Sequence, residues 1–296
     1  SNNISTNSSQ YNSGNGHPSS VYDCFIAKIN LDGIRIWGRY FGGEAADYAR
    51  NITIDLNNNI ILTGVTHSIN NITTSGSFKE IKTQPVDYNG LMESFVAKFN
   101  ENGNLIWSTY YGKCEVKSVD TDSNSNIFIS GYTLNNPYIS TIGSHQPNFS
   151  NSSQNDSFLG KFSPDGQRIW GTYYGGYNEE NNFSLKVDTE DNIYISGYTR
   201  SNEFIATPTS HQPNKGSGGT DADAYLAKFN QDGELIWGTY YGGSELEHWE
   251  SYTIDINNNN EIFLSGSTKS SNNISTVGSY SETLNSGEIY DCFIVK

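Results

Sequence analysis

The chain has 296 residues and a formal net charge of −15, and only 34% of its residues are hydrophobic. Asn, Ser and Gly make up about a third of the chain, which favours disorder, whereas 20 Tyr, 14 Phe and 5 Trp favour a packed core. The composition excludes a helical bundle, a membrane-inserted protein and a disulfide-dense miniprotein. The acidic excess argues against nucleic acid as a partner, because binding to phosphates needs Lys and Arg.

The first recurring motif along the chain is a short run that begins with an acidic residue and continues with large apolar ones. It predicts a β-strand, because such runs are rich in aromatic and β-branched residues and are bounded by Asn, Asp and Gly. Its five copies are DCFIAK (23–28), ESFVAK (93–98), DSFLGK (156–161), DAYLAK (223–228) and DCFIVK (291–296).

A second motif follows the first four copies, after an Asp-Gly or Asn-Gly pair that predicts a tight hairpin turn. It is a strand with a central tryptophan, and the spacings between Trp37, Trp107, Trp170 and Trp237 are 70, 63 and 67 residues. We expect these tryptophans to pack between neighbouring sheets rather than to bind a cofactor. The copies are GIRIWGRYFGG (33–43), GNLIWSTYYG (103–112), GQRIWGTYYGG (166–176) and GELIWGTYYGG (233–243).

A third motif follows each tryptophan and contains two strands joined by an Asp/Asn-rich turn, since such residues tolerate left-handed backbone angles. A long connection with an IST-GS-QP pattern then leads to the next copy of the first motif. Each unit therefore predicts four strands. In the best-defined unit they are expected at 184–188, 192–199, 223–229 and 234–241.

Four-stranded antiparallel units of this period predict an all-β fold, a β-propeller of about four blades that spans residues 1–296 as one repeat region. The strand order predicts seventeen strands, one more than a closed four-bladed ring holds, so we expect a fragment of a larger ring or an open array. A four-bladed ring with a displaced end strand is the alternative. The units are approximately 22–43 (partial), 44–112, 113–176, 177–243 and 244–296 (partial).

The motifs DAYLAKFNQDGELIWGTYYGG and VDTEDNIYISGYT resemble the SBBP repeats, which are bacterial β-propeller repeats of secreted and surface proteins. The resemblance covers essentially the whole chain and implies a propeller in an extracellular location. It implies no enzymatic activity, because the repeated residues of that family are architectural. One departure is Lys113-Cys114, where the other units have a second glycine, and it predicts a local distortion of the strand that follows.

The three cysteines do not predict a disulfide framework or a metal site. Cys24 and Cys292 occupy equivalent positions of the repeat, where other copies have Ser or Ala, so we expect a tight buried position there. A bridge between these two would require the ends of the array to meet.

Catalytic residues are not expected. The chain has no Gly-x-Ser-x-Gly or His-Glu-x-x-His motif, and His145 and His211 match one another within a repeated loop. Acidic residues are abundant enough for a glycan hydrolase, but none has a distinctive context. We therefore predict no enzyme, with glycan hydrolysis as the remote exception.

Calcium is the metal that the sequence favours most, because hard cations prefer alternating oxygen-bearing side chains. The segment with Asp120, Asp122, Asn124 and Asn126 has this alternation, although a hairpin turn favours the same residues. No other cofactor is predicted.

The long connections present the aromatic and polar side chains of Tyr138, His145, Phe204 and His211, which suit a protein or glycan partner at the loop face of the propeller. The alternative is that these loops only cover blade edges. The sequence thus predicts a secreted or cell-surface scaffold for adhesion, protein interaction or extracellular structure, with possible self-assembly. A carbohydrate-binding module is the alternative function.

Overall fold

The computed structural model describes residues 22–83, 92–134, 136, 138–150, 154–216, 218–219, 221–247, 252–284 and 290–296. This part of the chain is entirely β-sheet and irregular structure, and it contains no helix long and apolar enough to cross a membrane. The strands are β1 (Cys24–Ile29), β2 (Arg35–Phe41), β3 (Asp47–Ile54), β4 (Ile60–Thr66), β5 (Glu93–Phe99), β6 (Leu105–Gly112), β7 (Glu115–Thr121), β8 (Ile127–Thr133), β9 (Asp156–Phe162), β10 (Arg168–Tyr174), β11 (Glu180–Val187), β12 (Ile193–Thr199), β13 (Asp223–Phe229), β14 (Leu235–Tyr241), β15 (Thr253–Ile256), β16 (Ile262–Thr268) and β17 (Asp291–Val295).

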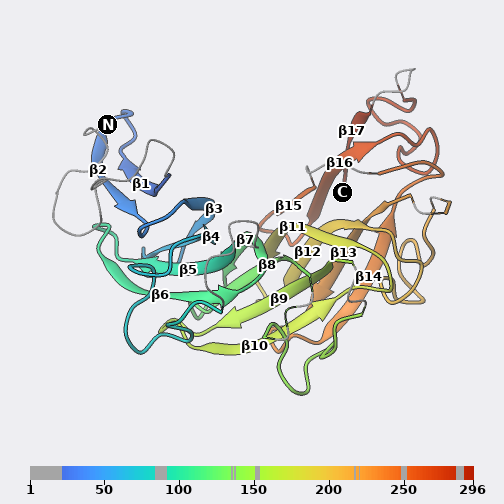
Figure 1. Cartoon of the computed structure of the whole chain (residues 1–296). Helices are drawn as coiled ribbons and strands as arrows, with labels where there is room; N and C mark the ends of the chain where they lie inside the picture. Colours follow the sequence, from blue (N-terminus) through green and yellow to red (C-terminus); the bar gives the residue numbers. More distant parts are fainter. Residues whose placement is uncertain are drawn as a thin grey trace. The chain divides into compact units, whose positions relative to one another are not determined.

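These strands form five sheets (Figure 1). Three have four strands, in the orders β3-β4-β5-β6, β10-β9-β8-β7 and β11-β12-β13-β14, and they are the blades that the repeat predicts. The ends of the array are incomplete, since β1-β2 is a two-stranded sheet and β15-β16-β17 a three-stranded sheet. The predicted count and order of seventeen strands are confirmed within the described residues, and there β16 pairs with β15 and β17.

The chain divides into two compact units. Unit 1 comprises Ser1–Ile127 and Phe162–Ile169, and unit 2 comprises Phe128–Lys161 and Trp170–Lys296. Unit 1 contains the β1-β2 pair and the first four-stranded sheet, and unit 2 contains the sheet β11-β12-β13-β14 and the last three strands.

The hairpin turns follow from the Asn and Gly residues that the sequence places there. In the turn between β13 and β14, the Asn230 side chain accepts hydrogen bonds from the backbone N–H groups of Asp232 (3.0 Å) and Glu234 (2.9 Å). Gly233 has a φ of +81°, a value that L side chains rarely adopt and glycine adopts freely. The same geometry recurs at Gly33, Gly103 and Gly166, so the Asp-Gly and Asn-Gly pairs act as the predicted hairpin turns.

Aromatic side chains form the core between consecutive sheets. In unit 1, the Phe41 ring of β2 lies between two rings of β5, with centroid distances of 5.1 Å to Phe95 and 5.5 Å to Phe99. In unit 2, Tyr174 lies in the same way 5.4 Å from Tyr225 and 5.5 Å from Phe229. The last aromatic of each tryptophan strand thus nests against the following sheet, which explains why the motif ends in large rings.

The tryptophans also connect consecutive sheets, through the hairpin turn of the following sheet. The Trp107 indole N–H donates to the Pro164 carbonyl (3.0 Å), and a Cβ on Gly166 would lie 2.6 Å from the Trp107 ring. The pairs Trp37–Gly103 and Trp170–Gly233 repeat this contact. The expectation that the tryptophans are packing residues therefore holds for these three.

The departure at Lys113-Cys114 has a visible effect. The strand β7 begins at Glu115, three residues after Gly112. In contrast, β3 and β11 begin five residues after the first glycine of the Gly-Gly pair that precedes them. Cys114 is buried and its N–H donates to the Gly112 carbonyl (2.9 Å), so a tight turn replaces the usual glycine pair.

All three cysteines are free thiols. Cys24 is buried, as the repeat predicts, but Cys292 is exposed, so the expected buried position is wrong for β17. The reason is that no further sheet of the described residues covers that side of β17.

Candidate functional site

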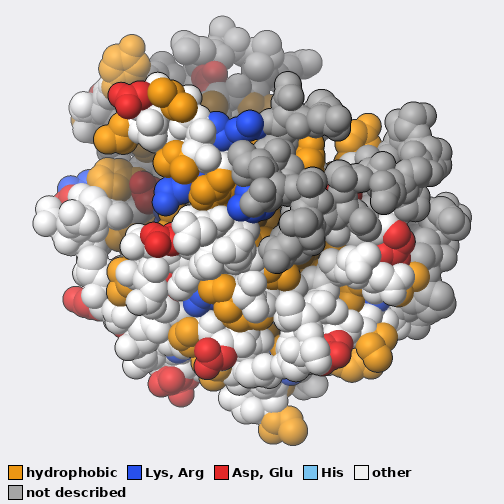
Figure 2. Space-filling model, turned by 90° about the vertical axis from the view of Figure 1, so that its left-hand side faces the viewer, with side chains coloured by type: hydrophobic (Ala, Val, Ile, Leu, Met, Phe, Trp, Pro, Cys, Tyr) orange, Lys and Arg blue, Asp and Glu red, His pale blue; other side chains and the backbone are white. Residues whose placement is uncertain are grey.

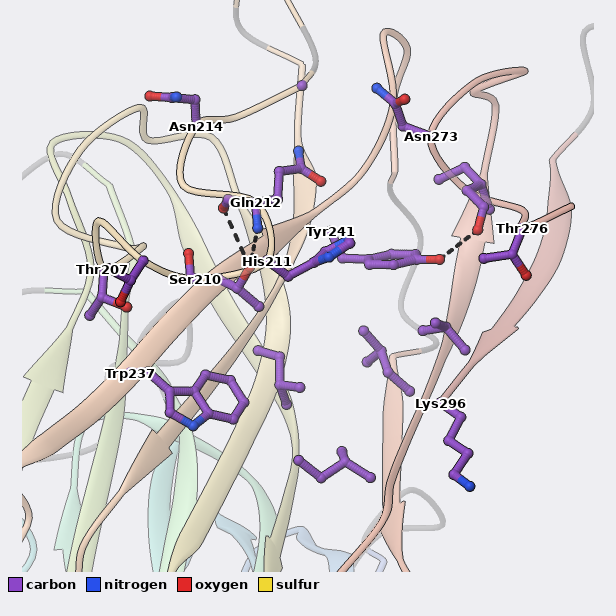
Figure 3. A pocket seen from close by; sticks show the side chains of 18 of the residues that line it. Thr207, Ser210, His211, Gln212, Asn214, Trp237, Tyr241, Asn273, Thr276 and Lys296 are labelled. Atoms are coloured by element: carbon purple, nitrogen blue, oxygen red, sulfur yellow. Dashed lines mark hydrogen bonds between the residues drawn. The ribbon is translucent and has the colours of Figure 1, made fainter.

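A cavity of about 990 Å³ lies in unit 2 between the sheet β11-β12-β13-β14 and the strands β16 and β17 (Figure 3). Leu226 and Trp237 form one wall, and Leu264 and Val295 form the other. Side chains of two loops, 207–216 and 273–276, complete the lining. These loops are long connections that follow β12 and β16, the segments in which the sequence predicts recognition residues.

Aromatic rings make the cavity suited to flat or apolar groups. The His211 ring stacks on Tyr241 with a centroid distance of 6.0 Å and an interplanar angle of 25°. The Tyr241 hydroxyl donates to the Ile274 carbonyl (2.6 Å), which ties β14 to the loop of the next sheet. Burial, assisted by the negative charge of Glu247, raises the pKa of Tyr241, so this hydroxyl stays a donor. Trp237 packs edge-on against Tyr194 at 6.1 Å.

The polar groups of the lining are mainly neutral. The Gln212 side chain is held by the framework, since its amide oxygen accepts from the Gly242 N–H (3.1 Å) and its amide nitrogen donates to Asp223 (3.2 Å). Thr276 and Asn273 contribute a hydroxyl and an amide, and Lys296 is the charged side chain at the edge (Figure 3). Among the described lining residues there is no carboxylate, so the cavity offers binding groups and no paired acids of the kind that glycoside hydrolysis uses.

The preceding junction in unit 2 shows what this space holds elsewhere in the repeat. Beside Trp170, the core cluster includes Phe229 at the end of β13 and Leu235 and Tyr240 of β14. Trp237 has the position of Trp170, but no described residue takes the places of those three side chains. In a complete blade, the end of the third strand and the fourth strand fill the space that corresponds to this cavity.

The four predicted loop residues do not form one site. His211 lines the cavity, while the His145 ring packs against Phe229 with a centroid distance of 5.8 Å and does not line it. Both histidines are exposed. Partial burial against these rings lowers the pKa of His145. Tyr138 and Phe204 are 55% and 64% exposed, and neither lines the cavity. The sequence pattern thus identified one residue of the cavity.

The predicted calcium segment is a hairpin turn in unit 1. The Asp122 carboxylate accepts the N–H groups of Asn124 (2.9 Å) and Asn126 (2.8 Å) and the Asn126 amide (2.7 Å). Asp120 accepts from the Thr121 N–H (2.9 Å). Asp55 and Asp188 hold their turns in the same way, which accounts for the alternation without a metal. No group of three or more His, Cys, Asp or Glu residues able to hold a metal occurs in the described residues, and calcium stays a prediction.

The structure also reveals a repeated polar feature that the sequence analysis missed. The first glycine of each Gly-Gly pair lies between two carboxyl groups. One carboxyl group lies at the start of β1, β9 or β13. The other belongs to the residue four positions after the second glycine. A Cβ on Gly175 would lie 2.5 Å from the Glu180 carboxylate and 3.1 Å from that of Asp156. The sequence signal for this feature is an Asp or Glu four residues after each Gly-Gly pair. The pairs are Asp23–Asp47, Asp156–Glu180 and Asp223–Glu247.

Burial raises the pKa values of four of these carboxyl groups, those of Asp47, Asp156, Glu180 and Glu247. Glu180 has a pKa of about 8, since desolvation and the nearby Asp156 charge outweigh its hydrogen bonds from Thr199 Oγ1 (2.6 Å) and the Gly176 N–H (2.8 Å). Burial likewise raises the pKa of Glu247 to about 7 and that of Asp47 to about 6. Glu180 therefore keeps its proton at neutral pH, and the carboxyl groups of Glu180 and Glu247 anchor the glycine pairs by accepting the N–H groups of Gly176 and Gly243.

Comparison with known families agrees with this geometry. The SBBP β-propeller repeat model matches residues 36–73 and 106–139, which run from a tryptophan strand through the next two strands into the long connection. These two segments match SBBP repeats, and the chain is a β-propeller repeat protein. The tryptophan motif of these segments also occurs around Trp170 and Trp237.

A curated protein, the uncharacterized WD repeat-containing protein L264 of Acanthamoeba polyphaga mimivirus, is 27% identical to this chain over 276 aligned residues. The alignment covers 76% of this chain and 19% of that protein. The chain therefore spans about a fifth of the length of this relative.

Proposed function

We propose that this chain is a non-catalytic interaction scaffold that works outside the cell, as part of a secreted or cell-surface protein. The supporting observation is that the recurring tryptophans, strand-end aromatics, turn residues and carboxyl groups have packing or turn roles. Trp107 covers a turn, Phe41 nests between rings, Asp122 closes a hairpin, and Glu180 anchors a glycine pair. The long connections after β4, β8, β12 and β16 differ between units, so a constant frame carries variable surfaces.

Two measurements test this proposal. Incubation of the purified chain with a panel of polysaccharides should release no reducing ends, and release above the buffer background would contradict a non-catalytic role. Antibody labelling of intact cells of the source organism should equal labelling of permeabilised cells. Labelling that appears only after permeabilisation would contradict the extracellular location.

Carbohydrate binding is the second candidate function, and the stacked pair of His211 and Tyr241 at a cavity with neutral polar groups favours it. Aromatic faces with hydroxyl and amide neighbours are suited to sugars. A glycan array should then report binding that His211→Ala removes. The matched control is His145→Ala, because His145 packs against Phe229. Silence of the wild-type chain across the array would exclude this candidate.

A further inference from the structure

The carboxyl groups of Asp156 and Glu180 lie next to one another in the interior of unit 2. Both residues are fully buried, and an oxygen atom of each lies beside Gly175, where a Cβ would be 2.5 Å from Glu180 Oε2 and 3.2 Å from Asp156 Oδ1. The acidic side chains that Figure 2 shows at the surface lie instead in small, separated patches. Two buried carboxyl groups this close do not both ionise at neutral pH, because their charges repel in surroundings of low dielectric constant.

The hydrogen bonds of the pair leave one acceptor open. Glu180 accepts from Thr199 Oγ1 (2.6 Å) and the Gly176 N–H (2.8 Å), and Asp156 Oδ2 accepts from the Ser150 N–H (2.9 Å). Asp156 Oδ1 is buried and has no hydrogen-bond partner among the described residues, although it lies beside the same glycine as Glu180 Oε2. A proton carried by Glu180 can supply the donor that a buried polar atom requires.

A proton fits between these two groups, and a metal ion does not. The backbone of Gly175 fills the gap, since even a Cβ there would overlap with Glu180 Oε2. The part of the chain that the structure describes also has no group of three or more His, Cys, Asp or Glu residues able to hold a metal. The proton is therefore the occupant that the geometry favours.

Other titratable groups that interact with Glu180 among the described residues do not replace this proton. The Lys215 ammonium group donates to the carbonyl oxygens of Arg200 (3.2 Å), Gly219 (3.2 Å) and Asp221 (2.7 Å), which hold it away from the pair. Burial raises the pKa values of three tyrosines that interact with Glu180, so their hydroxyl groups stay neutral. These are Tyr174, Tyr225 and Tyr240.

One unit of the repeat lacks the second acid. Glu180 lies eight residues before Asp188, whose carboxylate holds the turn between β11 and β12. Asp122 holds the corresponding turn of the sheet β10-β9-β8-β7, and eight residues before it the chain has Cys114. A neutral thiol thus takes the place of the carboxyl group in this unit.

The same unit carries a cation where the others have an amide. Lys79 forms an ion pair with Glu93, which begins β5 as Asp156 begins β9. In the next long connection Gln146 takes the place of Lys79, since each donates its backbone N–H to a threonine hydroxyl of the tryptophan strand at 2.8 Å. A single buried carboxyl group therefore has an ammonium group beside it, whereas the pair of acids has a neutral amide and needs the proton.

The pair also connects two long connections to the glycine turn between β10 and β11. In the connection after β8, the Gln146 amide oxygen accepts from the Gly175 N–H (3.0 Å). In the connection after β12, a Cβ on Gly176 would lie 2.4 Å from the Glu203 carbonyl oxygen, and Thr199 is held by Glu180. Repulsion within the pair therefore acts on both connections at once.

We propose that Asp156 and Glu180 form a proton-operated latch, which holds these two connections against the glycine turn while Glu180 is protonated and releases them when the proton passes to water. The latch goes beyond the scaffold proposal, because it acts on the connections whether or not they bind a partner. The sign of the effect follows from linkage. Glu180 has a pKa of about 8 in the closed state and regains its ordinary value of 4.5 when opening exposes it to water. The equilibrium constant for opening should therefore rise with pH between these values, by up to about tenfold per pH unit, and level off above them.

Hydrogen exchange of the full-length chain, measured by mass spectrometry over a series of pH values, tests the latch. Peptides that contain Ser150 and Gly176 should lose protection by up to about tenfold per pH unit between pH 6 and 8, after correction for the intrinsic exchange rate. Peptides of the connection that contains Lys79 are the internal control. Their corrected protection should stay constant, because an ammonium group balances Glu93.

Three variants separate the proton from other causes. Glu180→Gln keeps the shape of the side chain and removes the titrating group, so protection at Ser150 should no longer depend on pH in this range. Gln146→Lys supplies an ammonium group as Lys79 does, and it should lower the midpoint of the pH dependence by about 1 pH unit or more. Glu190→Gln, at an exposed turn, is the matched control and should behave like wild type.

Infrared spectroscopy detects the proton in the wild-type chain and needs no variant to fold. The spectrum at neutral pH should contain the band of a protonated carboxylic acid, and this band should disappear as the pH rises through about 8. Absence of the band, equal exchange profiles of wild type and Glu180→Gln, or a loss of protection on addition of EDTA would overturn the proposal. The last result would show that a metal ion holds the pair. None of these results bears on the scaffold function, which the polysaccharide and labelling experiments test.

Discussion

Trp107 shows how one residue links two consecutive sheets. Its ring lies on Gly166, and its N–H donates to the Pro164 carbonyl (3.0 Å) in the next hairpin turn. The sequence predicts a packing role for this residue, because four tryptophans recur in register. It does not indicate that the partner is the hairpin glycine of the following unit, since that contact joins residues 57 positions apart.

We expect Trp107→Ala to lower the free energy of unfolding by about 3–5 kcal/mol, the usual cost of deleting a buried large aromatic. Trp107 is only 7% exposed and lies against a turn, whereas Trp237 lines an open cavity. Trp237→Ala should therefore cost about 1 kcal/mol in the dilute monomer. Urea unfolding followed by circular dichroism measures both values. Equal losses of unfolding free energy in the two variants would show that Trp237 is packed as tightly as Trp107.

Glu180 makes stability depend on pH. Its pKa of about 8 in the native state lies above the ordinary value of 4.5, so the native state binds more protons than the unfolded state between these pH values. Stability should therefore fall as pH rises through this window, by at most about 1.4 kcal/mol per pH unit for one group. Glu180→Gln should flatten the fall in melting temperature between pH 4.5 and 8. Glu190→Gln, at an exposed turn, is the control and should leave the slope unchanged.

At the scale of the elements, strands and turns were largely predictable. The strand expected at 223–229 agrees with β13, and that at 234–241 differs from β14 by one residue. The first strand of the same unit, β11, begins at Glu180, four residues before the expected start. The reason is that Glu180, Asn181 and Asn182 are polar yet buried, and their pairing with β12 continues beyond a register shift between Asn182 and Ser184. Local propensity disfavours such residues in a strand, and only their tertiary hydrogen bonds retain them.

The glycine turns give a matched pair of substitutions. Gly166 and Gly143 have φ values of +83° and +82°, so alanine strains both backbones equally. A Cβ on Gly166 would also lie 2.6 Å from the Trp107 ring, whereas one on Gly143 would meet nothing within 4 Å. Gly166→Ala should therefore lower the free energy of unfolding by at least ~1 kcal/mol more than Gly143→Ala. Equal urea midpoints would contradict the indole–turn contact.

The Asp122 turn separates a structural from a metal-binding role. Asp122→Ala removes the acceptor of three hydrogen bonds and should lower the free energy of unfolding by about 1–2 kcal/mol. Asp122→Asn should retain most of the stability, because Asn100 holds an equivalent turn. If calcium binds, millimolar calcium should raise the melting temperature relative to EDTA, and the Asn variant should lose this shift. An unchanged wild-type melting temperature would exclude calcium.

Within each unit, each sheet is stabilised by its neighbours in the repeat. β5 and β9 are buried along their entire lengths, whereas β1 and β17 expose Phe25, Ile29, Cys292 and Ile294. In the sequence, the inner strands carry apolar residues on both faces, which predicts that sheets pack on both of their sides. The consequence for the ends, an uncovered hairpin and an open cavity, required the structure.

Hydrogen exchange should follow this gradient. Amides of β5, β9 and β13 should exchange slowest and those of β1 and β17 fastest, because terminal sheets have fewer packed neighbours. Mass spectrometry of peptides from each strand measures the order. Uniform protection would mean that the sheets unfold as one cooperative body.

The sequence by itself determined the all-β class, the strand order, the hairpin turns and the propeller repeat. These features depend on local patterns, namely alternation, Asn-Gly pairs and a period that recurs. The tertiary structure decided the pairing of Trp107 with Gly166, the raised pKa of Glu180 beside Asp156, and the cavity beside Trp237. Each of these depends on burial or on contact between distant segments, which no local pattern specifies.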